Sequence, residues 1–181
     1  MTEADVLASL LRRYNATVGP GPRRVPRYVC ATHVRIEGGY ASSFGTTRTC
    51  DFLALDTTAS RDYVLHVAEV KVSRADWLSE LRDPEKARTF TRHCDYWWLA
   101  VGDATVTRLD ELPEGWGLLV RQANGTLRER RPATRLTPPT AYEEDEWGVP
   151  HALYRPLARP LVAMFLRRAI LTERERTEPR G

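Results

Sequence analysis

Apolar residues near the start of the chain recur at the spacing of an α-helix. In residues 2–14, acids occupy the first turn and arginines the last, which suits the helix dipole. The positions on the apolar face are Val6, Leu7, Leu10 and Leu11. We therefore predict an amphipathic helix here. It ends before the Gly-Pro-Gly-Pro sequence of residues 19–22, which can continue neither a helix nor a strand.

Three segments further along are rich in β-branched and aromatic residues, as strands are. They are residues 28–36, 49–55 and 63–72, and a Gly/Ser/Thr-rich loop at residues 38–47 separates the first two. We expect these segments to form a small antiparallel meander.

A helix and a buried strand are expected next. Ser73 is a typical N-cap residue, and Asp76 stands at the capping-box position three residues later. The Asp-Pro pair at residues 83–84 restarts or kinks the helix, and the helical pattern continues to about residue 93. Residues 96–101 are apolar throughout, which predicts a strand buried on both faces. Strand, helix and strand then make a crossover unit.

The remaining segments complete a single α/β domain. They are a hairpin at residues 117–121 and 126–130, a Pro-rich acidic connection at 132–150 and a last helix at 156–171. We expect one domain over residues 1–171, with a mixed sheet of about four strands flanked by helices. Residues 172–181 are expected to be a disordered tail.

Composition adds the expectation of a soluble, cytoplasmic protein. The chain has 181 residues, 42% of them hydrophobic, which is enough for one core. No run approaches the roughly 18 apolar residues of a membrane span, and the N-terminus lacks a signal-peptide core. Cys30, Cys50 and Cys94 lie in apolar runs and are odd in number, which favours free thiols. Cys30 and His33, with His93, lack the paired spacing of a zinc site.

The basic residues suggest a partner more clearly than the net charge of +3 does. Arginine dominates them and gathers in residues 23–27 and 121–135. Guanidinium groups bind phosphate well, so Arg128, Arg130 and Arg131 are candidate contacts to nucleic acid. The alternative is that these clusters are simply solvated loops.

Charged residues inside the two most apolar strand segments are the main chemical signal. Strand alternation places Glu69 and Lys71 on one face, and Asp51 begins the apolar part of the preceding strand. Burying such charges is costly unless a partner or a metal compensates. Two carboxylates from adjacent strands suit Mg²⁺, and an ammonium beside them can orient a water molecule. The alternative is a structural salt bridge from Lys71 to Asp51 or Glu69.

This arrangement resembles the core signature of the PD-(D/E)XK nuclease superfamily. Asp51 is followed about twenty residues later by Glu69-Val70-Lys71. The flanking sequences CDFLAL and VAEVKVSRADWLSELRDPEKARTFTRHCDYWWLAV are similar to those of the MmcB-like DNA-repair group, as is LPEGWGLL. The resemblance covers about residues 50–119. Cys50 stands where the superfamily's name has proline.

The resemblance implies a role for each matching residue. Asp51 and Glu69 would be metal ligands, the Val70 carbonyl a further ligand, and Lys71 the group that orients the attacking water. Glu3 on the first helix is a candidate ligand through water; a plain first-turn carboxylate is the alternative.

Four further residues have candidate roles as contacts or as scaffold. Lys86 would face the site from the following helix, and Arg74 is a candidate contact to nucleic acid. Ser73 lies near enough to Lys71 to touch a phosphate, although a helix cap is the simpler interpretation. His66 is expected on the opposite face, in the core.

Together these inferences predict a Mg²⁺-dependent deoxyribonuclease with a restriction-endonuclease-like core, in which Mn²⁺ can substitute. DNA is the expected partner, with DNA repair, recombination or mobile-element processing as the setting. A homodimer or a protein partner in such a complex is also envisaged. The main alternative is a catalytically silent DNA-binding or scaffolding protein that retains the fold. A third is an ion pair in an unrelated α/β domain.

Overall fold

The computed structural model describes residues 1–21, 24–36, 48–83, 87, 90–91 and 94–136. Its helices are α1 (Glu3–Arg13) and α2 (Arg74–Leu81), with 3-10 turns η2 (Ala59–Arg61) and η3 (Leu109–Glu111). Its strands are β1 (Thr17–Val18), β2 (Val25–Pro26), β3 (Tyr28–Ile36), β4 (Arg48–Asp56), β5 (Leu65–Lys71), β6 (Tyr96–Val101), β7 (Gly117–Arg121) and β8 (Leu127–Arg131).

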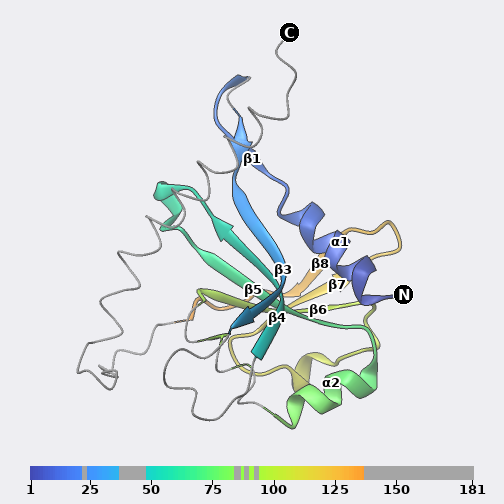
Figure 1. Ribbon diagram of the computed structural model, residues 1–181. Coiled ribbons are helices and arrows are strands. Elements are labelled where there is room, and N and C mark those ends of the chain that lie inside the picture. The colour runs from blue at the N-terminus through green and yellow to red at the C-terminus, as the bar shows by residue number, and fades with distance from the viewer. Residues whose placement is uncertain (22–23, 37–47, 84–86, 88–89, 92–93, 137–181) are drawn as a thin grey trace, which may run out of the picture.

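The main sheet has six strands in the order β3-β4-β5-β6-β7-β8 (Figure 1). The inner strands β5, β6 and β7 are parallel, and the outer pairs are antiparallel. The predicted α/β class and mixed sheet are confirmed, but four strands were too few. The predicted hairpin at residues 117–121 and 126–130 joins the same sheet, because β7 pairs with β6.

Gly117 makes that pairing possible. It lies opposite Trp98 in the register of β6 and β7. A Cβ atom at Gly117 would lie 2.3 Å from a ring carbon of Trp98, so a larger residue would collide with the indole. The hairpin's place in the sheet therefore depends on a glycine at the first position of β7.

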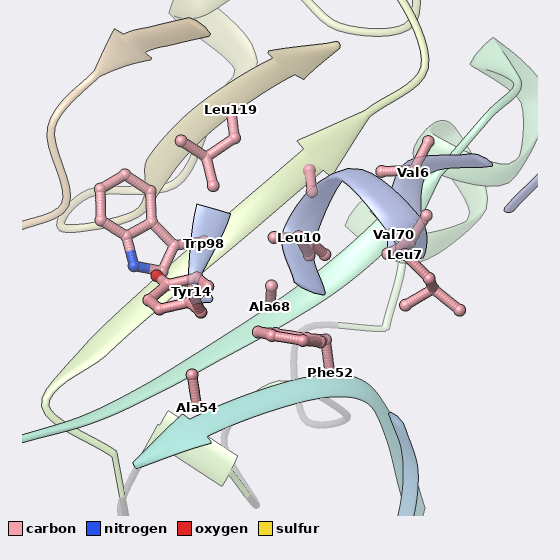
Figure 2. Packing of buried hydrophobic residues seen from close by; sticks show 11 residues of the cluster. Val6, Leu7, Leu10, Tyr14, Phe52, Ala54, Ala68, Val70, Trp98 and Leu119 are labelled. Carbon is pink, nitrogen blue, oxygen red and sulfur yellow. The ribbon is translucent and has the colours of Figure 1, made fainter. Parts of the chain in front are cut away.

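Helix α1 covers one face of the sheet (Figure 2). Thr2 and Asp5 form a reciprocal capping box at its start, and the hydrogen bonds from Thr2 lower the pKa of Asp5. The buried cluster beneath the helix contains Val6, Leu7, Leu10, Tyr14, Phe52, Ala54, Ala68, Val70, Trp98, Ala100 and Leu119. The predicted first helix is thus confirmed, except that Leu11 is 45% exposed.

The opposite face of the sheet packs against α2 and the segment that follows it. Two clusters fill this side. One contains Trp77, Leu99, Val101, Val106, Leu112, Leu118 and Val120, and the other contains Cys50, Val67, Ala87, Phe90, Cys94 and Trp97. Alternate residues of β5 and β6 thus enter different cores, which confirms that β6 is buried on both faces.

Two predicted boundaries differ from the structure. Strand β5 begins at Leu65, two residues later than the predicted start at residue 63. Asp62 and Tyr63 have positive φ angles and form a turn before it. Helix α2 ends at Leu81, and Ala87, Phe90 and Thr91 are helical further on. The predicted loop at 38–47, Lys86 and all segments beyond residue 136 lie outside the described residues. Within the described ranges, no helix combines the length and apolar character needed to cross a bilayer.

Candidate functional site

An acidic cleft of about 450 Å³ opens where β5 ends and α2 begins. Its lining residues are Glu3, Asp51, Glu69, Val70, Lys71, Val72, Asp76, Ser79, Glu80 and Asp83. Six of these side chains are carboxylates and one is an ammonium, so the cleft attracts cations. The structure brings together Asp51, Glu69, Val70, Lys71 and Glu3, which the sequence nominated as ligands or catalytic groups.

Strand alternation explains how Glu69 and Lys71 reach the acidic cleft. Ala68 and Val70 point under α1 and join its core, whereas Val67 packs on the other face. Glu69 and Lys71 continue the Val67 face to the end of β5. Their side chains are 3% and 12% exposed, respectively. The strand thus delivers two charges into a largely buried position at its C-terminal end.

Asp51 enters from the neighbouring strand, where the pairing of β4 with β5 stops. The last paired residues are Phe52 and Ala68. Beyond them, Oδ2 of Asp51 accepts a hydrogen bond of 2.7 Å from the Val70 amide. Beyond the end of the backbone pairing, the Asp51 side chain therefore accepts the hydrogen bond from β5. The donor, Val70, is the residue between Glu69 and Lys71.

The electrostatics of Cys50 show that Asp51 and Glu69 act on a common region. The thiol of Cys50 is buried, and burial is the main reason that its pKa is raised to about 11. The negative charges of Asp51 and Glu69 raise it further. Both carboxylates therefore influence the same sulfur atom.

Lys71 contacts two carboxylates from different elements. Its Nζ lies 2.6 Å from Oε1 of Glu69 and 3.2 Å from Oε2 of Glu80 on α2. Glu80 is itself buried, with a side chain 7% exposed. Our sequence reasoning missed this residue. The available signal was its position three residues after the buried Trp77, which places both on the inward face of the helix.

A second group of ligand atoms lies at the outer part of the site. Glu3, His33 and Asp51 each offer one ligand atom, and these atoms lie within 4.8 Å of one another. His33 falls opposite Asp51, between the pairs Thr32↔Phe52 and Val34↔Cys50 of β3 and β4. The sequence marks His33 only as a neighbour of Cys30, in a set that lacks the spacing of a zinc site. The pairing of the first two strand segments was the signal that could have found it.

The donor chemistry of these residues fits a divalent cation. Asp51 and Glu69 offer carboxylate oxygens and Val70 a carbonyl oxygen, which are the hard donors that Mg²⁺ prefers. Imidazole nitrogen is a better donor for Mn²⁺ than for Mg²⁺, so His33 beside Asp51 is compatible with Mn²⁺ as well.

Ser73 is the N-cap of α2, as the simpler interpretation predicted. Its hydroxyl accepts a hydrogen bond of 3.1 Å from the Asp76 amide and donates one of 2.7 Å to the Asp76 carboxylate. The same exchange holds the Asp76 side chain at the start of the helix, beside the acidic cleft.

Arg74 and Arg131 make intramolecular contacts. The Arg74 guanidinium forms a bidentate ion pair with Glu111, which is the main reason that the pKa of Glu111 is lowered to about 2. Arg131 donates to the backbone carbonyls of Trp116, Leu109, Leu112 and Pro113. By contrast, Arg128 and Arg130 are exposed on β8.

His66 lies on the face opposite Glu69, as expected. Its ring stacks on Tyr96, and its Nδ1 accepts a hydrogen bond of 3.3 Å from the Trp98 indole. Burial lowers the pKa of His66 to about 4. His66 is therefore a neutral core residue on the α1 side of the sheet.

Comparison with known proteins does not identify a family for the chain. No family model and no curated protein matches the chain. A solved structure of a protein of unknown function from Silicibacter pomeroyi is 20% identical, with a TM-score of 0.47. The match covers 98% of this chain and 92% of the other. Likeness at this level carries no argument about fold or activity.

Proposed function

We propose that the protein is a Mg²⁺-dependent phosphodiester hydrolase acting on DNA, built on a restriction-endonuclease-like core. One observation carries the proposal. Asp51 and Glu69, on adjacent strands, and the ammonium of Lys71 line a single open cleft at the end of β5. The resemblance of residues 50–119 to the PD-(D/E)XK signature supports the same reading.

Asp51, Glu69 and the Val70 carbonyl would hold the cation, with Glu3 reaching it through water. When bound, Mg²⁺ supplies positive charge that offsets the charge building up on the phosphate oxygens. The Val70 amide fixes Oδ2 of Asp51, so that carboxylate is oriented before any ligand arrives. Glu69 is fixed likewise by Lys71.

Lys71 would orient the water molecule that attacks phosphorus. Its ammonium already lies beside Glu69 at the end of the strand, in a cleft open to solvent. In the reaction, the water oxygen forms a bond to phosphorus while the bond to one ester oxygen breaks. The water loses a proton and the departing oxygen gains one, so the net change is the consumption of one water molecule.

DNA is the proposed substrate because exposed arginines accompany the acidic cleft. Arg128 lies at the start of β8, which pairs with the end of β7. The parallel strands β5, β6 and β7 end on the same side, so Arg128 and the acidic cleft lie at the same edge of the sheet. Three strand spacings of about 4.8 Å separate their strands, which lies within the width of a DNA duplex. An arginine at that position can hold the DNA backbone while the acidic cleft engages one phosphate.

Incubation of the purified protein with circular and linear DNA tests the proposal. Cleavage is expected with Mg²⁺ or Mn²⁺ and is lost with EDTA. Asp51→Asn serves as the matched control, because it keeps the shape of the side chain and removes one ligand charge. Tight DNA binding without cleavage under any metal would support the silent DNA-binding alternative. Absence of both binding and cleavage would leave only a structural role for the ion pairs.

A further inference from the structure

The contact between Lys71 and Glu80 suggests a function for Glu80, which is not among the proposed metal ligands. Lys71 lies between two buried carboxylates, at 2.6 Å from Glu69 and 3.2 Å from Glu80. Glu69 precedes Lys71 by two residues on the same strand, whereas Glu80 belongs to α2. The two contacts therefore hold the ammonium from independent elements.

A cation in the acidic cleft would change only one of these contacts. If Glu69 binds a divalent ion, the ion takes up much of the carboxylate's charge and also repels the ammonium. The pair of Lys71 with Glu69 then weakens. Glu80 is outside the proposed ligand set, and its attraction for Lys71 remains.

We propose that Glu80 is the positioning residue of this site: it retains the Lys71 ammonium in the acidic cleft when Glu69 is engaged by metal. This inference rests on the proposed function for its role in turnover. Its structural content, that Glu80 still holds Lys71 when Glu69 carries no charge, stands apart from any activity.

Helix α2 keeps Glu80 in place for this task. Ser73 caps the helix at its start, and Trp77, one turn before Glu80, is fully buried in the core on this side of the sheet. Arg74 ties the same turn to Glu111 and to the Val106 carbonyl. A carboxylate on so well anchored a helix can act as a fixed point for a flexible lysine.

The chain offers a clean way to observe Lys71 directly, because its only two lysines are Lys71 and Lys86. Protein labelled with ¹⁵N-lysine gives at most two ammonium signals, and Lys71→Met identifies the one from Lys71. An ammonium held by carboxylates exchanges slowly with water and gives a sharp signal, whereas a freely moving one does not.

The decisive measurement needs no metal. Glu69→Gln removes the negative charge of Glu69 and so imitates its neutralisation by a bound cation. We expect the Lys71 signal to persist in Glu69→Gln and in Glu80→Gln and to weaken when both changes are combined. Loss of the signal in Glu69→Gln alone would overturn the inference, because Glu80 would then be unable to hold Lys71. So would a signal that is as strong in the double variant as in Glu69→Gln. If Glu80→Gln does not fold, Glu80→Asp, which retracts the carboxylate by one methylene, replaces it.

Cleavage kinetics test the role in turnover. Glu80→Gln is expected to lower kcat by about tenfold to a hundredfold with little change in KM for DNA, because the water-orienting group is misplaced. In a Lys71→Met background the same change should have no further effect. Glu114→Gln, at an exposed acid outside the acidic cleft, is the charge-matched control.

The two proposals fail in different ways. A parent protein that cleaves no DNA removes the proposed function, while the lysine signals still decide whether Glu80 holds Lys71. A parent that cleaves DNA, with Glu80→Gln equally active, overturns the positioning role alone. The positioning role is also overturned if Glu80→Gln lowers kcat equally in the parent and in the Lys71→Met background.

Discussion

The amide nitrogen of Val70 lies 2.7 Å from Oδ2 of Asp51, just beyond the last paired residues of β4 and β5. This bond gives Asp51 a structural task beside its proposed role as a ligand. Asparagine can still accept the bond, whereas alanine cannot. Asp51→Asn should therefore leave the unfolding free energy nearly unchanged, and Asp51→Ala should lower it by about 1 to 3 kcal/mol.

Both Asp51 variants should lose cleavage and most of the metal-induced rise in melting temperature. Thermal unfolding with and without Mg²⁺ measures both effects on the same samples. An Asp51→Asn protein that still gains the parent's stabilisation from Mg²⁺ would show that Asp51 is no ligand.

Lys71→Met leaves Glu69 and Glu80 as two buried carboxylates without their shared cation. In the absence of metal, we expect this variant to lose about 3 kcal/mol of stability. Mg²⁺ should restore part of that loss, because a divalent ion neutralises Glu69 but leaves Glu80 without Lys71. Cleavage should nevertheless stay at least about a hundredfold below the parent.

Chemical denaturation with and without Mg²⁺ separates the two readings of Lys71. If the loss of stability persists in saturating Mg²⁺, Lys71 belongs to a structural ion network. Recovery with metal, combined with lost cleavage, identifies a site in which metal and lysine share the same carboxylates.

The arginines of β8 should divide into two groups. Charge reversal at Arg128 or Arg130, which are exposed, should weaken DNA binding and lower the slope of log affinity against log salt by about one unit each. Arg131→Ala should instead lower stability by about 1 to 3 kcal/mol, since it leaves several backbone carbonyls without their donor. Binding titrations between low and moderate salt, beside urea unfolding, check both. A salt slope unchanged in Arg128→Glu would remove that residue from the interface.

Because His66 is buried in its neutral form, we predict that the protein loses stability in mild acid. Burial lowers its pKa from 6.5 to about 4, so the unfolded chain takes up a proton at a higher pH than the folded protein does. Above pH 6.5, the pKa of His66 in the unfolded chain, His66 does not change the free energy of unfolding. As the pH falls below that value, His66 lowers this free energy. Between about pH 7.5 and about pH 5 the cost is about 2 kcal/mol.

Urea unfolding at the two pH values, for the parent and for His66→Gln, measures this contribution. Glutamine can keep the hydrogen bond from Trp98 without titrating. The parent should lose more stability than the variant by the stated amount. Equal losses would mean that another group is responsible.

Features that depend on local periodicity could be predicted from the sequence. Period-two alternation placed Glu69 and Lys71 on one face and His66 on the other, and apolar spacing identified α1. The convergence of Asp51 followed from pairing neighbouring strands. These inferences needed only the pattern within one or two adjacent elements.

Features that depend on distant packing could not be predicted. Glu80 reaches Lys71 because α2 folds back over β5, and the place of β7 beside β6 depends on Gly117 fitting against Trp98. By residue type, Arg74 and Arg131 were candidate phosphate contacts. In the fold, both guanidinium groups instead donate to acceptors of the same chain. An arginine's partner is set by what tertiary structure brings near it, which residue type alone does not reveal.

The packing of α1 also fixes the order in which the domain can assemble. An isolated helix of eleven residues is marginal in water, so α1 needs its docking surface. That surface extends from Phe52 on β4 to Leu119 on β7, and Arg13 pairs with Glu129 on β8. During synthesis the helix emerges before the strands that it packs against, and it can dock fully only after residue 129 has left the ribosome. Glu3 enters the acidic cleft with that helix, so a cleft built mainly by β4, β5 and α2 is complete only after β8 has been synthesised.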